Sequence, residues 1–179
     1  MIDWNVVVTV RDGHFKAACD FLQSLGRIRR THYYNMLVMK VADIRFLLEQ
    51  LRERSEAKPE IVSMLSRVAP VTQKFEFQAP EEFETKAQDI ALGFVPQLRQ
   101  KRFHVRMHRH GFKEKLHATD EERHLGSLLI AALDRAGTSG QVDFHDPDAI
   151  LDVETVDNQA GLALWCREDL NRYPFLSFD

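Results

Sequence analysis

The sequence has few cysteines that could crosslink the chain and no long apolar run that could hold it in a membrane. Its only two cysteines, Cys19 and Cys166, form no CxxC pair among 179 residues, a pattern typical of reduced, packed thiols in a cytoplasmic protein. No apolar run approaches the ~18 residues that span a bilayer, so no membrane partner is expected. The N-terminus shows no basic leader before an apolar stretch. Eight glycines and six prolines are too few for a low-complexity chain. The composition therefore predicts an ordinary globular protein.

Motifs for catalysis and nucleotide binding are also missing. The sequence has no GxSxG elbow, P-loop, GxGxxG or HExxH motif. Gly137-Thr138-Ser139-Gly140 lacks the lysine and the following helix that a phosphate loop requires. Asp146 and Asp148 flank Pro147, and aspartates in such turns usually cap local backbone amides. We therefore expect no catalytic residue, no cofactor and no resident metal.

Positive charge is concentrated in one stretch of the chain. The formal net charge is −3, but residues 99–117 contain Arg99, Lys101, Arg102, Arg106, Arg109, Lys113 and Lys115 against Glu114 alone. Seven cations and one anion give +6, so the remainder carries −9, because +6 and −9 sum to −3. Five of the eight histidines (His104, His108, His110, His117, His124) lie in or just after this stretch. Such a patch on an acidic protein favours one defined anionic partner.

The first half of the chain alternates extended and helical patterns. Strands are expected at residues 4–10, 28–34, 36–41 and 71–77. A helix is expected after Asp12-Gly13, a second one capped by Asp43, and a short third one starting at Pro59. The order β-α-β-β-α-β predicts a ferredoxin-like unit over residues 1–78.

The second half, residues 79–179, predicts an α/β domain. Pro80 suits the first position of a helix. Phe103, Val105 and Met107 then alternate with His104, Arg106 and His108, which predicts a strand with one apolar and one cationic face. Further strands are expected at 142–144, 150–156 and 162–166. The fold class is therefore α+β followed by α/β.

A long helix is expected over residues 119–136. Thr119 and Glu122 have the spacing of a capping box, in which each side chain binds an otherwise unpaired amide hydrogen. Leu125, Leu129 and Leu133 continue one apolar stripe, and Gly137 is suited to end the helix.

The order of motifs in the second half resembles the THUMP domain. The residues that carry the likeness are the strand Phe-His-Val-Arg-Met-His-Arg (103–109), a helix containing His124-Leu125-Gly126, and the stretch Val142-Asp143-Phe144-His145-Asp146-Pro147-Asp148. An extended segment such as residues 67–71 also precedes the helix that leads into the THUMP strand. The likeness covers about residues 60–170 and is greatest to stand-alone THUMP proteins that assist tRNA cytidine acetylation. It implies binding of RNA, usually at the tRNA acceptor end, with catalysis by a separate enzyme.

The candidate RNA-binding residues lie on this strand and in the loop after it. Phosphate binding requires cations along the path of the RNA backbone, and exposed bases can stack on aromatic rings. The candidates are Lys101, Arg102, Arg106, His108, Arg109, His110, Phe112, Lys113 and Lys115. Two of them have a structural alternative: Arg106 can pair with Asp152 or Glu154, and Phe112 can pack beneath its own loop.

Two other functions remain open on the sequence alone. The histidines at 104–124 can serve a metal-dependent enzyme, although His104 and His108 have ligand spacing only on a helix. The chain can also be a protein-interaction module without RNA binding, whose apolar C-terminal segment, residues 173–178, docks a partner or packs on its own core. The RNA, its modification, the partner enzyme and the oligomeric state are not predicted.

Overall fold

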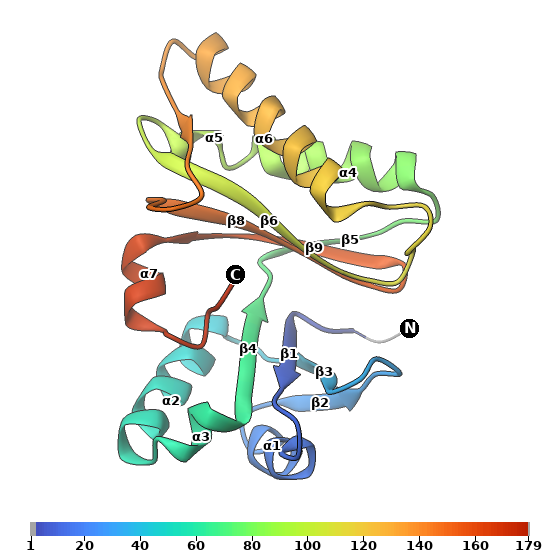
Figure 1. Ribbon diagram of the computed structural model, residues 1–179, viewed down its shortest axis with the longest axis vertical. Coiled ribbons are helices and arrows are strands. Elements are labelled where there is room, and N and C mark those ends of the chain that lie inside the picture. The colour runs from blue at the N-terminus through green and yellow to red at the C-terminus, as the bar shows by residue number, and fades with distance from the viewer. Residues whose placement is uncertain (1–2, 179) are drawn as a thin grey trace. The chain divides into compact units, whose positions relative to one another are not determined.

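The computed structural model describes residues 3–178, except for the side chain of Val62. Its contacts divide the chain into two compact units, which are treated separately below (Figure 1). Unit 1 consists of the described residues of Met1–Pro70 and Asp169–Asp179, and unit 2 is Val71–Glu168. Among the residues described, no helix is both long and apolar enough to cross a membrane.

Unit 1 contains one antiparallel sheet and its helices. The strands are β1 (Val6–Val10), β2 (Arg27–Arg30), β3 (Met36–Lys40) and β4 (Leu65–Pro70). The helices are α1 (Phe15–Leu22), α2 (Ile44–Ala57) and α3 (Glu60–Met64). The sheet order is β2-β3-β1-β4, so the last strand pairs with the first. This is the β-α-β-β-α-β order of a ferredoxin-like unit, with α3 added before β4.

Local sequence signals explain two boundaries in unit 1. The Asp43 carboxylate accepts a hydrogen bond of 3.0 Å from the backbone N–H of Phe46, which confirms the predicted cap of α2. Asn35 turns the chain between β2 and β3 with a φ of 50°, a left-handed conformation that asparagine tolerates well.

The C-terminal segment packs as part of unit 1. The carbonyl of Phe175 accepts a hydrogen bond of 2.9 Å from the backbone N–H of Val68 on β4. Tyr173, Phe175, Leu176 and Phe178 are all buried, and the Tyr173 hydroxyl donates to Glu49 on α2. The choice left open by the sequence is therefore settled in favour of packing on the core.

The last strand of unit 1 differs from the prediction. The sequence places it at residues 71–77, but the strand beside β1 is Leu65–Pro70, where Val6 pairs with Pro70 and Val8 with Val68. The segment after Pro70 supplies β5 (Gln73–Glu76), which pairs with β9 in the other sheet. The predicted domain boundary lies between residues 78 and 79, whereas the contacts divide the chain between Pro70 and Val71. Residues 65–70 and 73–76 are both extended, and their partner strands, β1 and β9, are distant in sequence. The local pattern therefore does not show which of the two segments pairs with β1.

Unit 2 contains a five-stranded sheet of order β5-β9-β8-β6-β7. Its remaining strands are β6 (Arg102–His110), β7 (Gln141–Val142), β8 (Ala149–Val156) and β9 (Gln159–Cys166). Its helices are α4 (Pro80–Leu92), α5 (Val95–Leu98) and α6 (Ala118–Arg135), and α7 (Arg167–Arg172) begins at its end. Strand β6 runs parallel to β8 and β7, while β9 is antiparallel to β8 and β5.

Helices α4 and α6 cover one face of this sheet (Figure 1). Phe103, Val105 and Met107 of β6 lie in the core beneath them, together with Leu125 and Leu129 of α6. The predicted alternation of β6 and the apolar stripe of α6 are therefore confirmed.

The start of α6 corrects the predicted capping box. His117 occupies the N-cap position and no side chain caps the helix there. The Glu122 carboxylate instead accepts a hydrogen bond of 2.8 Å from the backbone N–H of Met107 on β6. The end of α6 is as predicted, with Gly137 at a φ of 69°.

Candidate nucleic-acid interface

Strand β6 positions most of the predicted RNA-binding residues. Its even-numbered side chains lie on the sheet face opposite the apolar core, because alternate residues of a strand face opposite ways. Strand β7 pairs with β6 only at Arg102 and Phe103. Beyond these two residues, the edge of β6 that faces away from β8 has no strand partner among the described residues.

Arg102 is held by a group of aspartates. Its Nη1 lies 2.7 Å from Asp146 and its Nη2 lies 3.3 Å from Asp148, while Asp148 also accepts the backbone N–H of Arg102 at 2.9 Å. These bonds hold the pKa of the Asp148 carboxyl well below its usual range, the backbone bond contributing most. Arg167 binds the same two aspartates. Arg102 therefore has a structural partner for each end of its guanidinium.

The aspartates act differently from the sequence-based expectation. Asp143, and not Asp146 or Asp148, caps local backbone amides, accepting the N–H groups of His145 at 2.8 Å and Asp146 at 3.0 Å. Asp146 and Asp148 bind arginines from β6 and α7 instead. The loop from 143 to 148 is consequently fixed to the beginning of β6.

Arg106 and His108 also lie near carboxylates. Arg106 Nη1 is 3.9 Å from Glu122 of α6, a pair different from the predicted alternatives Asp152 and Glu154. His108 Nδ1 lies 3.7 Å from Asp152 and 3.4 Å from Glu154, the two β8 carboxylates on its face of the sheet. Both carboxylates are fully buried. Carboxyl groups thus lie beside the middle of β6.

His108, Asp152 and Glu154 form a group that could hold a metal ion. One ligand atom from each residue lies within 4.8 Å of the others. His104 takes no part in this group: its Nδ1 contacts the carbonyl oxygen of Asp143 at 2.9 Å, and its ring stacks on Phe144 at 5.1 Å. The predicted histidine cluster is therefore divided.

The loop between β6 and α6, residues 111–117, presents its cations outward. Phe112 adopts a φ of 50° and packs on Phe77 with ring centroids 5.0 Å apart, and Leu116 is buried in the core. The N–H groups of residues 115 and 116 both donate to the Phe112 carbonyl at 3.0 Å. Lys113 and Lys115 lie between these two anchors and are exposed. Phe112 therefore serves as an anchor for the loop.

Three cations at this end of β6 pair with no carboxylate within the described chain. Lys113 and Lys115 are two of them, and the third is Arg109, whose Nη1 donates to the carbonyl of Gly111 at 2.7 Å. We call Arg109, Lys113 and Lys115 the loop cations. His110 is half-buried beside them, and its backbone N–H donates to Thr155. Lys101, also half-buried, lies at the opposite end of β6.

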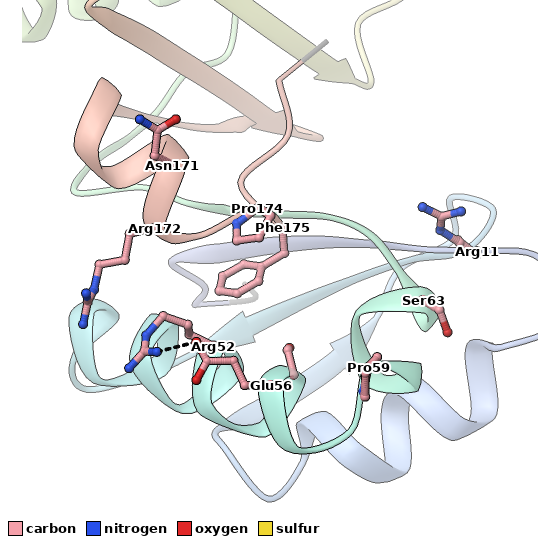
Figure 2. A pocket seen from close by; sticks show the side chains of 10 residues that line it. Arg11, Arg52, Glu56, Pro59, Ser63, Asn171, Arg172, Pro174 and Phe175 are labelled. Carbon is pink, nitrogen blue, oxygen red and sulfur yellow. Dashed lines mark hydrogen bonds and ion pairs between the residues drawn. The ribbon is translucent and has the colours of Figure 1, made fainter.

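Each unit has a hollow on its surface. A pocket of about 590 Å³ in unit 2 lies along α6 and the open edge of β6, with Val105, Ile130 and Phe144 among its lining residues. Figure 2 shows the pocket of about 610 Å³ in unit 1, bounded by α2, α3 and the C-terminal segment. Arg52 in this second pocket is bound to Glu56, so part of its positive charge is neutralised.

Comparison with protein-family models and with curated proteins finds no match. Solved structures do match. PH1313 from Pyrococcus horikoshii Ot3 superposes with a TM-score of 0.61 at 12% identity, over 91% of this chain and 54% of that one. TrmN from Thermus thermophilus superposes with a TM-score of 0.64 at 16% identity, over 90% and 45%. A 4-thiouridine synthetase, solved with RNA and bound ATP, gives 0.56 at 15% identity, over 91% and 41%.

The fold is THUMP-like. Identities this low establish the fold alone, and the chain spans about half the length of these neighbours or less. The likeness supports the THUMP-like domain that the sequence predicts, whereas the resemblance to the cytidine-acetylation proteins remains a prediction.

Sequence reasoning missed three of the carboxylates near β6, because its local patterns place Glu122 in a helix cap and Asp146 and Asp148 in a turn. It did bring Asp152 and Glu154 to β6, but beside Arg106, whereas they lie near His108. A parallel β6–β8 pair brings residues 102 and 148 together, so the signal that could have found these pairs is strand order and not local spacing.

Proposed function

We propose that this chain is a non-catalytic RNA-binding protein that presents the acceptor end of tRNA to a separate modifying enzyme. The observation that carries the proposal is the display of the loop cations on a THUMP-like fold. One solved neighbour of the same fold is described as an RNA complex.

The geometry of the loop suits phosphate binding. The anchors Phe112 and Leu116 fix the backbone on either side of Lys113 and Lys115, so only the flexible lysine side chains lose freedom on binding. Arg109 adds a planar guanidinium, which can bind a phosphate with two parallel hydrogen bonds. A defined group of three cations on an acidic protein favours a localised contact over general coating of nucleic acid.

The remaining candidates have smaller roles in this proposal. Arg102 and Arg106 have carboxylate neighbours, so their charge is partly neutralised within the fold. Lys101 lies at the opposite end of β6 from the loop cations, and His108 lies near two buried carboxylates. These two residues and His110 would act as secondary contacts. Phe112 would contribute by positioning the loop.

The decisive experiment is a salt titration of tRNA binding with a charge-reversed variant. Each phosphate neutralised adds about 0.7–0.9 to the slope of log K against log salt. Arg109→Glu/Lys113→Glu/Lys115→Glu should therefore lower that slope by about 2–3 and weaken binding at fixed salt. A matched control, Lys16→Glu/Lys58→Glu/Arg135→Glu, removes three exposed cations elsewhere and should bind nearly as the wild type does.

Equal loss in the control and the loop variant would mean that only total charge matters, and the loop would no longer be the site. Full-strength binding by the loop variant would also remove this assignment. A wild-type protein that binds no tRNA at low salt would overturn the RNA-binding function itself.

A second candidate is a metal-dependent enzyme, which is favoured by the group of His108, Asp152 and Glu154. One imidazole and two carboxylates suit a divalent ion such as zinc, iron or manganese. Elemental analysis of the purified protein tests this alternative. Stoichiometric metal that is lost in His108→Ala would favour the enzyme, and metal-free protein would exclude it.

A further inference from the structure

The hairpin of β2 and β3 in unit 1 carries a second concentration of positive charge. From Phe21 to Ala42 the sequence contains no acidic residue, while it includes Arg27, Arg29, Arg30 and Lys40. All three arginines are exposed, and they lie on β2, which is the edge strand of its sheet.

Two of these arginines have no side-chain partner within the described residues. Arg27 and Arg29 are two positions apart, so they share a sheet face and lie about 6.7 Å apart along the strand. Arg30 faces the other way and lies over the ring of Phe15 at 5.4 Å. Lys40 pairs with Asp3 at 3.1 Å. We call Arg27 and Arg29 the hairpin arginines.

The turn of the hairpin holds an exposed aromatic ring in a fixed position. Tyr34 is 81% exposed, the highest value among the large hydrophobic side chains described. A hydrogen bond to Asp12 raises the pKa of the Tyr34 phenol, and Asn35 binds the same carboxylate at 2.5 Å. The ring face is therefore free while its hydroxyl end is tethered.

We propose that this hairpin is a second RNA-binding surface, in which Arg27 and Arg29 bind two phosphates and Tyr34 stacks on an unpaired base. The inference rests on the proposed RNA-binding function and assigns a contact to unit 1. Two cations on a strand whose following turn carries an exposed ring match the phosphate-and-stacking chemistry by which single-stranded RNA is held.

The ordinary explanation for charge on an edge strand is protection. Charged side chains there stop two sheets from pairing edge to edge. That role needs a charge of either sign, whereas RNA binding needs a positive one. Glutamate substitutions therefore separate the two explanations, because they keep the edge charged and reverse its sign.

The test compares tRNA binding by Arg27→Glu/Arg29→Glu, Tyr34→Ala and a control, Lys58→Glu/Arg135→Glu. Loss of two phosphate contacts should lower the salt slope by about 1.4–1.8. Loss of one stacked base should weaken binding about fivefold or more without changing the slope. The control should bind as the wild type does. Size-exclusion chromatography reports self-association, and Arg27→Gln/Arg29→Gln provides a milder variant if the glutamates impair folding.

The outcomes separate this inference from the function on which it rests. If the wild type binds tRNA and both arginine variants bind it equally well, the hairpin surface is refuted and the loop cations stand. If the arginine variants self-associate but keep their RNA affinity, edge protection is the role of these residues. If the wild type binds no RNA, both proposals fail.

Discussion

Glu121 of α6 is a carboxylate in a place that disfavours its charge. The residue is only 6% exposed, and its Oε2 has no hydrogen-bond partner in the described chain. Burial, then the neighbouring charges of Glu84 on α4 and Asp120, raise its pKa from 4.5 to about 7. The folded protein therefore holds a proton at pH 6 that the unfolded chain has already released.

The sign and size of the effect follow from this difference. The pKa of Glu121 is higher in the folded state than in the unfolded state. Proton binding at Glu121 therefore makes its full contribution to the free energy of unfolding below pH 4.5, and this contribution is lost as the pH rises through about 7. A shift of about 2.5 units corresponds to about 3 kcal/mol of unfolding free energy. Glu121→Gln mimics the protonated form at every pH, so it should be near neutral at pH 4.5 and stabilising by about 2–3 kcal/mol at pH 8.5.

Urea unfolding at these two pH values measures the difference directly. Glu114→Gln, a substitution in the exposed β6–α6 loop, provides the control and should show no pH-dependent change. If Glu121→Gln changes stability equally at both pH values, the Glu121 carboxyl titrates normally and the argument from its burial is wrong.

Further predictions concern the packing of unit 2. Glu122→Ala should destabilise the fold by about 1–3 kcal/mol, because it removes the acceptor of the Met107 N–H, whereas Thr119→Ala should change urea stability by less than about 0.5 kcal/mol. Comparable losses of stability in the two variants would indicate that Thr119 and Glu122 form the capping box after all. Gly126→Ala should stabilise α6 by about 0.5–1 kcal/mol, since its added Cβ meets nothing within 4 Å. Gly161→Ala should lower stability by about 1–3 kcal/mol, because its Cβ would lie 2.7 Å from that of Val71; unchanged thermal unfolding would contradict this.

Local signals in the sequence predicted the elements that depend on local chemistry. Asp43 caps α2, Gly137 ends α6, and the alternation of β6 separates an apolar face from a polar one. Each of these features is decided within a few residues of chain, so composition and spacing are sufficient to find it.

The sequence failed where partners are distant. Residues 65–70 and 73–76 are both extended, and only pairing with β1 or β9 decides the sheet to which each belongs. The same limit applies to the candidate site. The sequence pattern located the cations of the candidate site, but it did not show that Arg102 binds two aspartates that lie 44 and 46 residues further along the chain.

Ultraviolet crosslinking of the intact protein to total cellular tRNA tests the proposed RNA contact most directly, with mapping of the linked peptides and nucleotides. We expect crosslinks on residues 109–117, joined to nucleotides of the acceptor end. Crosslinks confined to other peptides, or none above the level given by the loop-cation variant, would contradict RNA binding through this loop.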